Sequence, residues 1–217
     1  MTPSKMNRTT FLIDGFNLYH SLNDAHWRLR KGGIKWLNIH KLCRSYIPHI
    51  TPRATLEQVY YFSAFAYHRQ RKDPSLIHRH ELLIECLKAT GVNVEMGKFK
   101  AKQIRCNGCK QDVTHYEEKE TDVAISVKLL EVFFKDECDT AVLVTGDTDL
   151  GPAIKTAFQL FPEKQIYCLF PYGRKNKELA QLATGSFVIT TDRYQGCQFD
   201  DPFVTHEGKK LRKPASW

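Results

Sequence analysis

Short apolar runs alternate along this chain with longer segments in which apolar residues recur at helical spacing. The runs predict β-strands over residues 9–13, 56–66, 92–96, 141–145, 165–170 and 187–190. The helical spacing predicts α-helices over residues 37–47, 75–90, 117–134, 150–160 and 176–183, and a further helix directly after residue 14. Strands that alternate with helices indicate parallel pairing, because each crossover returns the chain to the same end of the sheet. The pattern therefore predicts the α/β class, as a Rossmann-like α/β/α sandwich with a mostly parallel central sheet.

The same pattern predicts the limits of the domain and the inner face of one helix. Periodicity ends near residue 190, so we expect one domain over residues 9–190, followed by a basic and mobile C-terminal tail over 191–217. In the predicted helix over 117–134, four apolar residues form a stripe that we expect to face the core. These are Val123, Val127, Leu130 and Phe134.

Carboxylates lie where predicted strands meet predicted helices. Asp14 ends the first strand, and Asp147 and Asp149 follow the central strand over 141–145. Asp122 lies in the first turn of the helix that precedes this strand. Taken singly, each is also typical of a helix cap or a tight turn, because Asp fills both roles well. If the two strands are neighbours, their carboxyl ends lie at one edge of the sheet, and the acids converge there.

A cluster of carboxylates needs a cation. Carboxylates in one site repel one another, and one of them stays protonated unless a cation lies among them. Oxygen ligands without a nearby His or Cys select Mg²⁺ or Mn²⁺. Such ions can generate hydroxide, orient it in line with a phosphodiester and stabilise the departing oxygen. The acids therefore indicate metal-assisted hydrolysis of a phosphodiester.

The net charge indicates the class of partner. The 217 residues carry a formal net charge of +8, and the sequence pI is about 9.1, which favours a polyanion such as RNA. Arg69, Arg71 and Lys72 form a basic loop after the second predicted strand, which we expect at the same sheet edge as the acids. No apolar run approaches the roughly 20 residues of a membrane helix, and the segment over 1–10 lacks the apolar core of a signal peptide. We therefore expect no membrane contact and a cytoplasmic location.

Two of the seven cysteines form a CxxC knuckle, Cys106 and Cys109. This spacing is typical of half of a structural zinc site. A complete site needs four ligands, and beyond His115 the others would have to come from distant positions. Because half-sites are a common false positive, a zinc site and ordinary thiols both stay open.

Three segments resemble the motifs of one family. FLIDGFN over 11–17, EKETDVAISVKLL over 118–130 and AVLVTGDTDLGPAI over 141–154 are similar in order and spacing to the motifs of the NYN domain, a branch of the PIN-like nucleases. The resemblance covers residues 9–189 and implies a Rossmann-like domain with Mg²⁺- or Mn²⁺-dependent endonuclease chemistry, usually on RNA. It places the family's acids on Asp14, Asp122, Asp147 and Asp149, its accompanying Asn on Asn17, its motif Lys on Lys119 and its small hydroxyl on Thr145.

Two functions follow from these residues. The first is a metal-dependent endoribonuclease in which the four aspartates hold one or two ions of Mg²⁺ or Mn²⁺ and Asn17 orients the scissile phosphate or a metal-bound water. Contacts to RNA would come from Arg69, Arg71, Lys72 and Lys119. The alternative is a catalytically inactive or weakly active RNA-binding regulatory module of the same fold. A phosphatase of the haloacid type fits less well, because its second Asp would fall on Phe16. Single-stranded or structured RNA is the expected partner, and a homodimer stays open.

Overall fold

A six-stranded sheet forms the centre of the computed structural model, which describes residues 6–29, 33–105, 108 and 110–217. The strand order is β3-β2-β1-β6-β7-β8, and all neighbours pair in parallel. The strands are β1 (Asn7–Asp14), β2 (Ala54–Ser63), β3 (Asn93–Met96), β6 (Thr140–Val144), β7 (Gln165–Phe170) and β8 (Gly185–Val188). Each predicted strand is present within a few residues of its expected limits, so the predicted fold class is confirmed.

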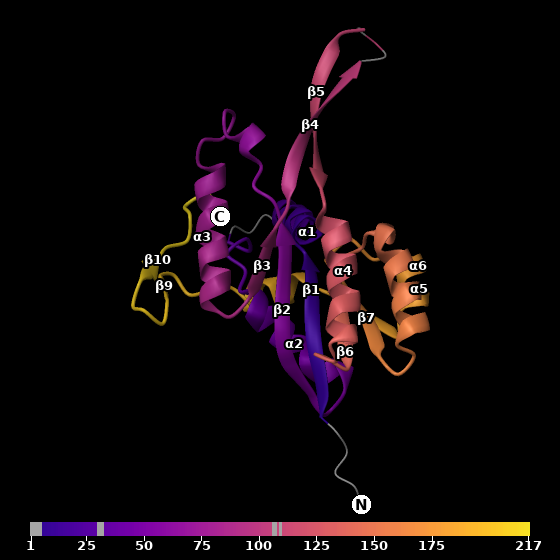
Figure 1. Ribbon diagram of the computed structural model, residues 1–217. Coiled ribbons are helices and arrows are strands. Elements are labelled where there is room, and N and C mark those ends of the chain that lie inside the picture. Colours follow the sequence, from indigo (N-terminus) through magenta and orange to yellow (C-terminus); the bar gives the residue numbers. More distant parts are fainter. Residues whose placement is uncertain (1–5, 30–32, 106–107, 109) are drawn as a thin grey trace, which may run out of the picture.

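Helices cover both faces of this sheet (Figure 1). One face is covered by α1 (Gly15–Leu29), α2 (Ile39–Ile50), α3 (Leu76–Ala89) and α7 (Thr191–Gly196). The other face is covered by α4 (Thr121–Phe134), α5 (Gly151–Leu160) and α6 (Lys177–Leu182). Two 3₁₀ turns, η1 (Tyr67–Arg69) and η2 (Thr148–Leu150), lie between strands and the helices that follow them. None of the described helices is long and apolar enough to cross a membrane.

Successive residues of the central strands face the two cores in turn. On β1, Phe11 and Ile13 pack in the core beneath α1 and α2, whereas Leu12 packs in the core beneath α4. Every residue of β6 is buried. A strand covered on both faces needs apolar side chains on both, and this explains why β1 and β6 read as unbroken apolar runs.

A long hairpin, called the arm below, projects from the domain between β3 and α4 (Figure 1). Its strands β4 (Lys98–Arg105) and β5 (Asp112–Lys119) pair in antiparallel fashion along their full length, and most of their residues are exposed. The prediction of one helix over 117–134 is therefore wrong at its start. Residues 117–119 extend the ladder of the arm, and Glu120, at φ 82°, turns the chain so that α4 begins at Thr121.

Helix α4 buries a different stripe from the predicted one. Its buried side chains include Ile125, Leu129, Val132 and Phe133. Val123 and Val127 are exposed, and Phe134 is 81% exposed, so the predicted stripe is wrong for these three residues, whereas Leu130 is partly buried against the core. The helix carries apolar residues around most of its circumference, and such spacing cannot decide which side packs on the sheet.

The C-terminal segment is packed against the domain, contrary to the expected free tail. The buried ring of Tyr194 in α7 lies 2.9 Å from Ser21 of α1, measured between the two hydroxyl oxygens. Phe199 and Leu211 join the same core. A short hairpin of β9 (Phe203–Val204) and β10 (Lys210–Leu211) follows α7. These anchors are too far apart in sequence to produce periodicity, so the pattern of the sequence did not reveal them.

Helix α2 also extends beyond its predicted end. Pro48 lies inside the helix, in its last turn, instead of after it. Proline removes one backbone donor from the helix, and near the end of a helix that loss affects a single hydrogen bond. The helix therefore continues to Ile50, whose buried apolar side chain stabilises the extra turn.

Candidate active site

The pairing of β1 with β6 brings the first and last acidic motifs to one edge of the sheet. The register places Ile13 beside Val144, so Asp14 and Thr145 emerge next to each other. The two strands are therefore neighbours, as the predicted convergence of the acids requires.

Asp14 is held by two hydrogen bonds in a buried position. Its carboxylate oxygens accept from the backbone N–H of Asn17 (2.9 Å) and from the hydroxyl of Thr145 (3.0 Å), and the residue is 5% exposed. Burial raises the pKa of Asp14, the two hydrogen bonds act against this, and the negative charge of Asp147 raises the pKa further. The side chain is therefore fixed in place, but its negative charge is disfavoured until a cation compensates it.

Thr145 and Asn17 connect the two motifs. The Thr145 hydroxyl donates to Asp14 and accepts from the backbone N–H of Asp147 (3.1 Å). The side-chain oxygen of Asn17 accepts from the backbone N–H of Gly146 (3.1 Å). Asn17 thus uses its oxygen to hold the loop after β6, and it acts as a positioning residue for the acids.

Two glycines permit this close approach of backbone segments. A Cβ on Gly15 would lie 2.5 Å from the carbonyl oxygen of Phe62 and 2.7 Å from the ring of Tyr61. A Cβ on Gly146 would collide with the carbonyl oxygen of Arg174. Each glycine adjoins an acid, Asp14 or Asp147, so the backbone next to each acid is packed too closely for any side chain at the glycine position.

Asp122 lies at the N-terminus of α4, near the other three acids. Burial, followed by the charges of Asp147, Asp14 and Asp149, raises the pKa of Asp122 to about 6. The charges of the other three aspartates act on Asp122, and in this sense the four side chains share one electrostatic environment.

Asp147 and Asp149 occupy the turn that follows β6. Asp147 is half-buried, caps η2 and accepts from the backbone N–H of Asp149 (3.0 Å), whereas Asp149 is exposed. In the part of the chain that the structure describes, none of the four aspartates forms an ion pair with Lys or Arg. An acidic group without cationic partners in a protein of net charge +8 is an unusual arrangement.

The four aspartates fit a hard divalent cation in the chemistry of their donors. Among the described residues, no set of three or more His, Cys, Asp or Glu side chains is already placed so that it could hold a metal ion. Mg²⁺ is usually bound through one or two carboxylates and keeps several waters, so it does not require such a set. Buried and half-buried carboxylates that raise one another's pKa are groups whose charge a cation would neutralise.

Glu118 is a further acid at this site that the sequence analysis did not select. Burial raises its pKa, and so does the charge of Asp122. Its side chain accepts from the hydroxyl of Thr121, at the junction between the arm and α4. The sequence pattern does not indicate Glu118, because it predicts a helix over 117–119, whereas these residues end β5 of the arm.

The predicted RNA-binding residues line two adjacent cavities or lie on the arm. Arg69 and Lys72 line a cavity beside the acids, and Arg71 lines a second one at the base of the arm. Lys119 is paired with Glu117 (2.7 Å). Cys106 and Cys109 lie outside the described residues, so the zinc site stays a prediction.

The geometry agrees with comparisons to known proteins. The sequence profile of the NYN domain matches residues 8–189. The chain belongs to the NYN domain family. NYN domains have the PIN-like nuclease fold, so the family match supports a hydrolase at a coarse level.

A solved structure supports the fold of this NYN domain. A crystal structure of a protein of unknown function from Vibrio parahaemolyticus matches with a TM-score of 0.58 at 17% sequence identity, and the match covers 88% of this chain and 98% of that chain. At this identity the similarity concerns the fold alone. No curated protein matches the chain.

Proposed function

We propose that this NYN domain is a metal-dependent endoribonuclease. The observation that carries the proposal is the group of four aspartates at one sheet edge, which share one electrostatic environment and have no Lys or Arg partner among the described residues. Repulsion among them disfavours the folded state, and a bound cation would remove it. An edge built in this way is better explained by a metal-binding role than by stability.

The residues that would hold the ion are Asp14, Asp122, Asp147 and Asp149. When bound, Mg²⁺ or Mn²⁺ would supply an activated water and neutralise charge that develops on the phosphodiester. Thr145 holds Asp14 and the backbone of Asp147 close together through two hydrogen bonds. Asn17 holds the loop after β6 through its hydrogen bond to the N–H of Gly146. Because the pKa of Asp122 is about 6, a cation competes with a proton at that carboxylate.

The positive charge of the protein would hold the substrate. Arg69 and Lys72 lie beside the acids without a carboxylate partner among the described residues, so they are available for phosphates on one side of the scissile bond. Lys98 and Lys100 of the arm are both close to Glu120, at 3.0 and 3.8 Å. Electrostatic attraction of this kind makes RNA binding dependent on salt.

The decisive experiment measures cleavage of labelled single-stranded and structured RNA by the wild type, Asp147→Asn and the control Asp200→Asn, each with Mg²⁺, Mn²⁺ or a chelator. Asp200 is exposed and lies in the C-terminal segment, between α7 and β9. We expect metal-dependent cleavage by the wild type and by Asp200→Asn, and a decrease of at least about a thousandfold for Asp147→Asn.

Two outcomes would overturn the proposal. Cleavage by Asp147→Asn at the wild-type rate would remove the acids from the chemistry. Salt-sensitive RNA binding by the folded wild type, with no cleavage of either RNA in any metal, would favour the regulatory RNA-binding module instead.

A further inference from the structure

A cavity of about 740 Å³ lies beside the acidic edge, and its walls come from four parts of the chain. Gly15 and Phe16, the residues directly after Asp14, line it, and so does Glu118, whose pKa responds to the charge of Asp122. The volume falls within the range of known ligand sites. Because the cavity lies next to Asp14, it could bind the part of the substrate that adjoins the reacting bond.

One wall of the cavity is a continuous aromatic cluster. The rings of His68 and Tyr116 are stacked with centroids 4.2 Å apart, and His68 also contacts Phe99 at 4.7 Å. Phe99 in turn meets Phe16 edge to face at 5.5 Å. The rings belong to η1, the arm and α1, so the wall forms where the base of the arm contacts the domain.

A further aromatic ring, that of Tyr19 in α1, lines the cavity, and this residue is 38% exposed. His20 meets the ring at 5.8 Å between ring centroids, and Lys35 Nζ lies 6.0 Å from its centroid. The ring has a flat face that a planar group could cover. Base stacking on aromatic side chains is tolerant of sequence, because every base has a π-face.

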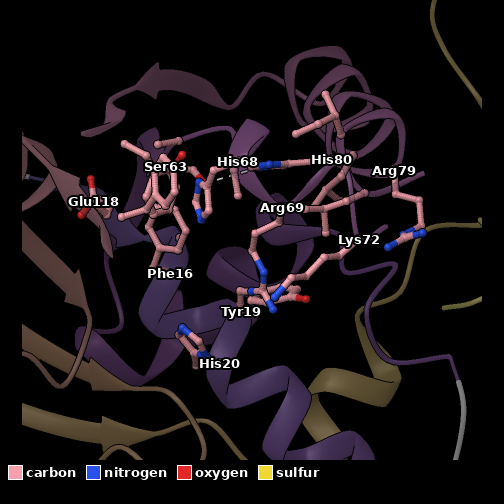
Figure 2. A pocket seen from close by; sticks show the side chains of 18 of the residues that line it. Phe16, Tyr19, His20, Ser63, His68, Arg69, Lys72, Arg79, His80 and Glu118 are labelled. Atoms are coloured by element: carbon pink, nitrogen blue, oxygen red, sulfur yellow. Dashed lines mark hydrogen bonds between the residues drawn. The ribbon is translucent and has the colours of Figure 1, made fainter. Parts of the chain in front are cut away.

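Two cationic side chains line the same cavity as this ring. Figure 2 shows Arg69 and Lys72 extending from the segment around η1 toward Tyr19. Neither forms an ion pair within the described residues, in contrast to Arg79, which is paired with Asp73 (2.5 Å). Unpaired Arg and Lys beside an aromatic face supply both components of a nucleotide site, which are phosphate contacts and stacking.

Polar groups of the inner wall are uncharged at neutral pH. Burial lowers the pKa of His80 to about 4, and its Nε2 lies 3.4 Å from the hydroxyl of Ser63. A neutral imidazole has one donor and one acceptor, and a hydroxyl has both. Such groups suit the edge of a base or a ribose hydroxyl better than a second phosphate.

We propose that this cavity is a nucleotide subsite that binds one unpaired nucleotide of an RNA strand, with its base on the aromatic side chains and its phosphate at Arg69 and Lys72. The inference rests on the proposed nuclease function, because it assigns the neighbouring nucleotide to the strand that the acids would cleave. It narrows the substrate to RNA that is unpaired at this position, since stacked and paired bases of an A-form helix do not offer their faces to side chains.

The test uses the Asp147→Asn protein, in which binding can be measured without cleavage. Fluorescence anisotropy would give the affinity for a labelled single-stranded octaribonucleotide and for derivatives that carry one abasic ribose at each position in turn, with a chelator present. We expect one position at which loss of the base weakens binding about tenfold. In Tyr19→Ala added to this background, we expect loss of the base at that position to have no effect.

A second variant and a matched control keep the result interpretable. Tyr116→Ala removes a ring of the wall from the arm instead of α1, so misfolding of one variant does not leave the subsite untested. Phe134→Ala removes an 81% exposed ring from α4, which covers the opposite face of the sheet, and it should keep the full abasic effect.

Three results would overturn the subsite. They are equal binding of all abasic strands, an unchanged abasic effect in both Tyr19→Ala and Tyr116→Ala, and equal affinity for the same strand in a duplex. None of them bears on cleavage by the wild type, so the subsite and the nuclease function can fail separately.

Discussion

The acidic edge and the aromatic cavity adjoin each other, yet they are built by different means. At the edge, Asp14 ends β1 and Asp147 lies in the turn after β6, and backbone N–H groups of Asn17 and Asp149 hold their carboxylates. The cavity depends instead on side chains from α1, η1, α3 and the arm that meet through ring contacts. A sheet places the groups of a reaction accurately, whereas side chains from several elements form a site whose shape can change by substitution.

The two regions also differ in charge. The edge concentrates carboxylates without cationic partners among the described residues, and the cavity places Arg69 and Lys72 without anionic ones. A substrate complex could therefore supply the missing opposite charge in each region. A cation would neutralise the edge, and a phosphate would neutralise the cavity. The comparison predicts that substitutions at the edge change the rate, and that substitutions in the cavity change the affinity.

The largest effect should come from Asp14→Asn. We expect cleavage to fall by at least about a thousandfold, because a buried carboxylate next to the reacting bond is lost. In the presence of a chelator, the same variant should unfold at a higher temperature than the wild type, because burial raises the pKa of Asp14 and so disfavours its charged form. Cleavage assays and thermal unfolding would measure both.

Asp192→Asn is a suitable control for this variant. Asp192 is exposed in the first turn of α7, so its substitution should leave the rate within a factor of about two. A variant Asp14→Asn that retains wild-type cleavage would break the comparison, since the edge would then not determine the rate.

A smaller effect concerns the pH dependence of stability through Asp122. Its pKa is raised from 3.8 to about 6 in the folded protein, so its protonated form is favoured by folding. The contribution to stability is complete below about pH 4 and is lost as the pH rises through 6. In metal-free protein, Asp122→Asn should match the wild type near pH 4 and be more stable near pH 7, by on the order of 1 kcal/mol after allowance for solvent screening.

Urea unfolding at the two pH values, with a chelator, measures this difference. A stability difference between the variant and the wild type that is equal at both pH values would show that Asp122 does not share the electrostatic environment of the other acids. Addition of Mg²⁺ should reverse the order at pH 7, because the wild type would then gain stability from the bound cation and the variant would lack one of the carboxylates.

The smallest effect is expected in the cavity, for Lys72→Gln. The loss of one phosphate contact should reduce the slope of log affinity against log salt by about 0.7 and leave the cleavage rate at saturating RNA unchanged. Binding titrations between low and moderate salt would measure the slope. Lys88→Gln, at the far end of α3 and outside the cavity, should keep the wild-type slope. An equal decrease for both variants would mean that only the net charge matters.

Much of the edge could be predicted because its determinants are local. The apolar runs of β1 and β6 predict strands, and Asp14 and Asp147 adjoin those strands in sequence, so the fold class carries them to one place. Less could be predicted where the buried side of a helix depended on the elements that pack against it. The stripe with Val123 and Phe134 had the correct helical spacing but faced outward, because the sheet packs against the other apolar side of α4.

The arm and the C-terminal segment show the same limit for longer distances. The strands of the arm alternate weakly and are exposed on both faces, so no apolar pattern separated residues 117–119 from the helix that follows. Tyr194 and Leu211 are anchors whose neighbours are distant in sequence. Burial of an isolated aromatic residue depends on its partners and leaves no periodic signal.

By itself, the sequence determined the parallel sheet, the two acidic motifs at its strand ends and the excess of positive charge, because each is encoded by neighbouring residues. Only the tertiary structure decided that the strands of these motifs are adjacent, that Glu118 joins the acids and that Phe16, Tyr19, His68 and Tyr116 line a common cavity. The reason is physical. Strand and turn preferences act over a few residues, whereas a cavity is the space left when distant elements have packed as closely as their side chains allow.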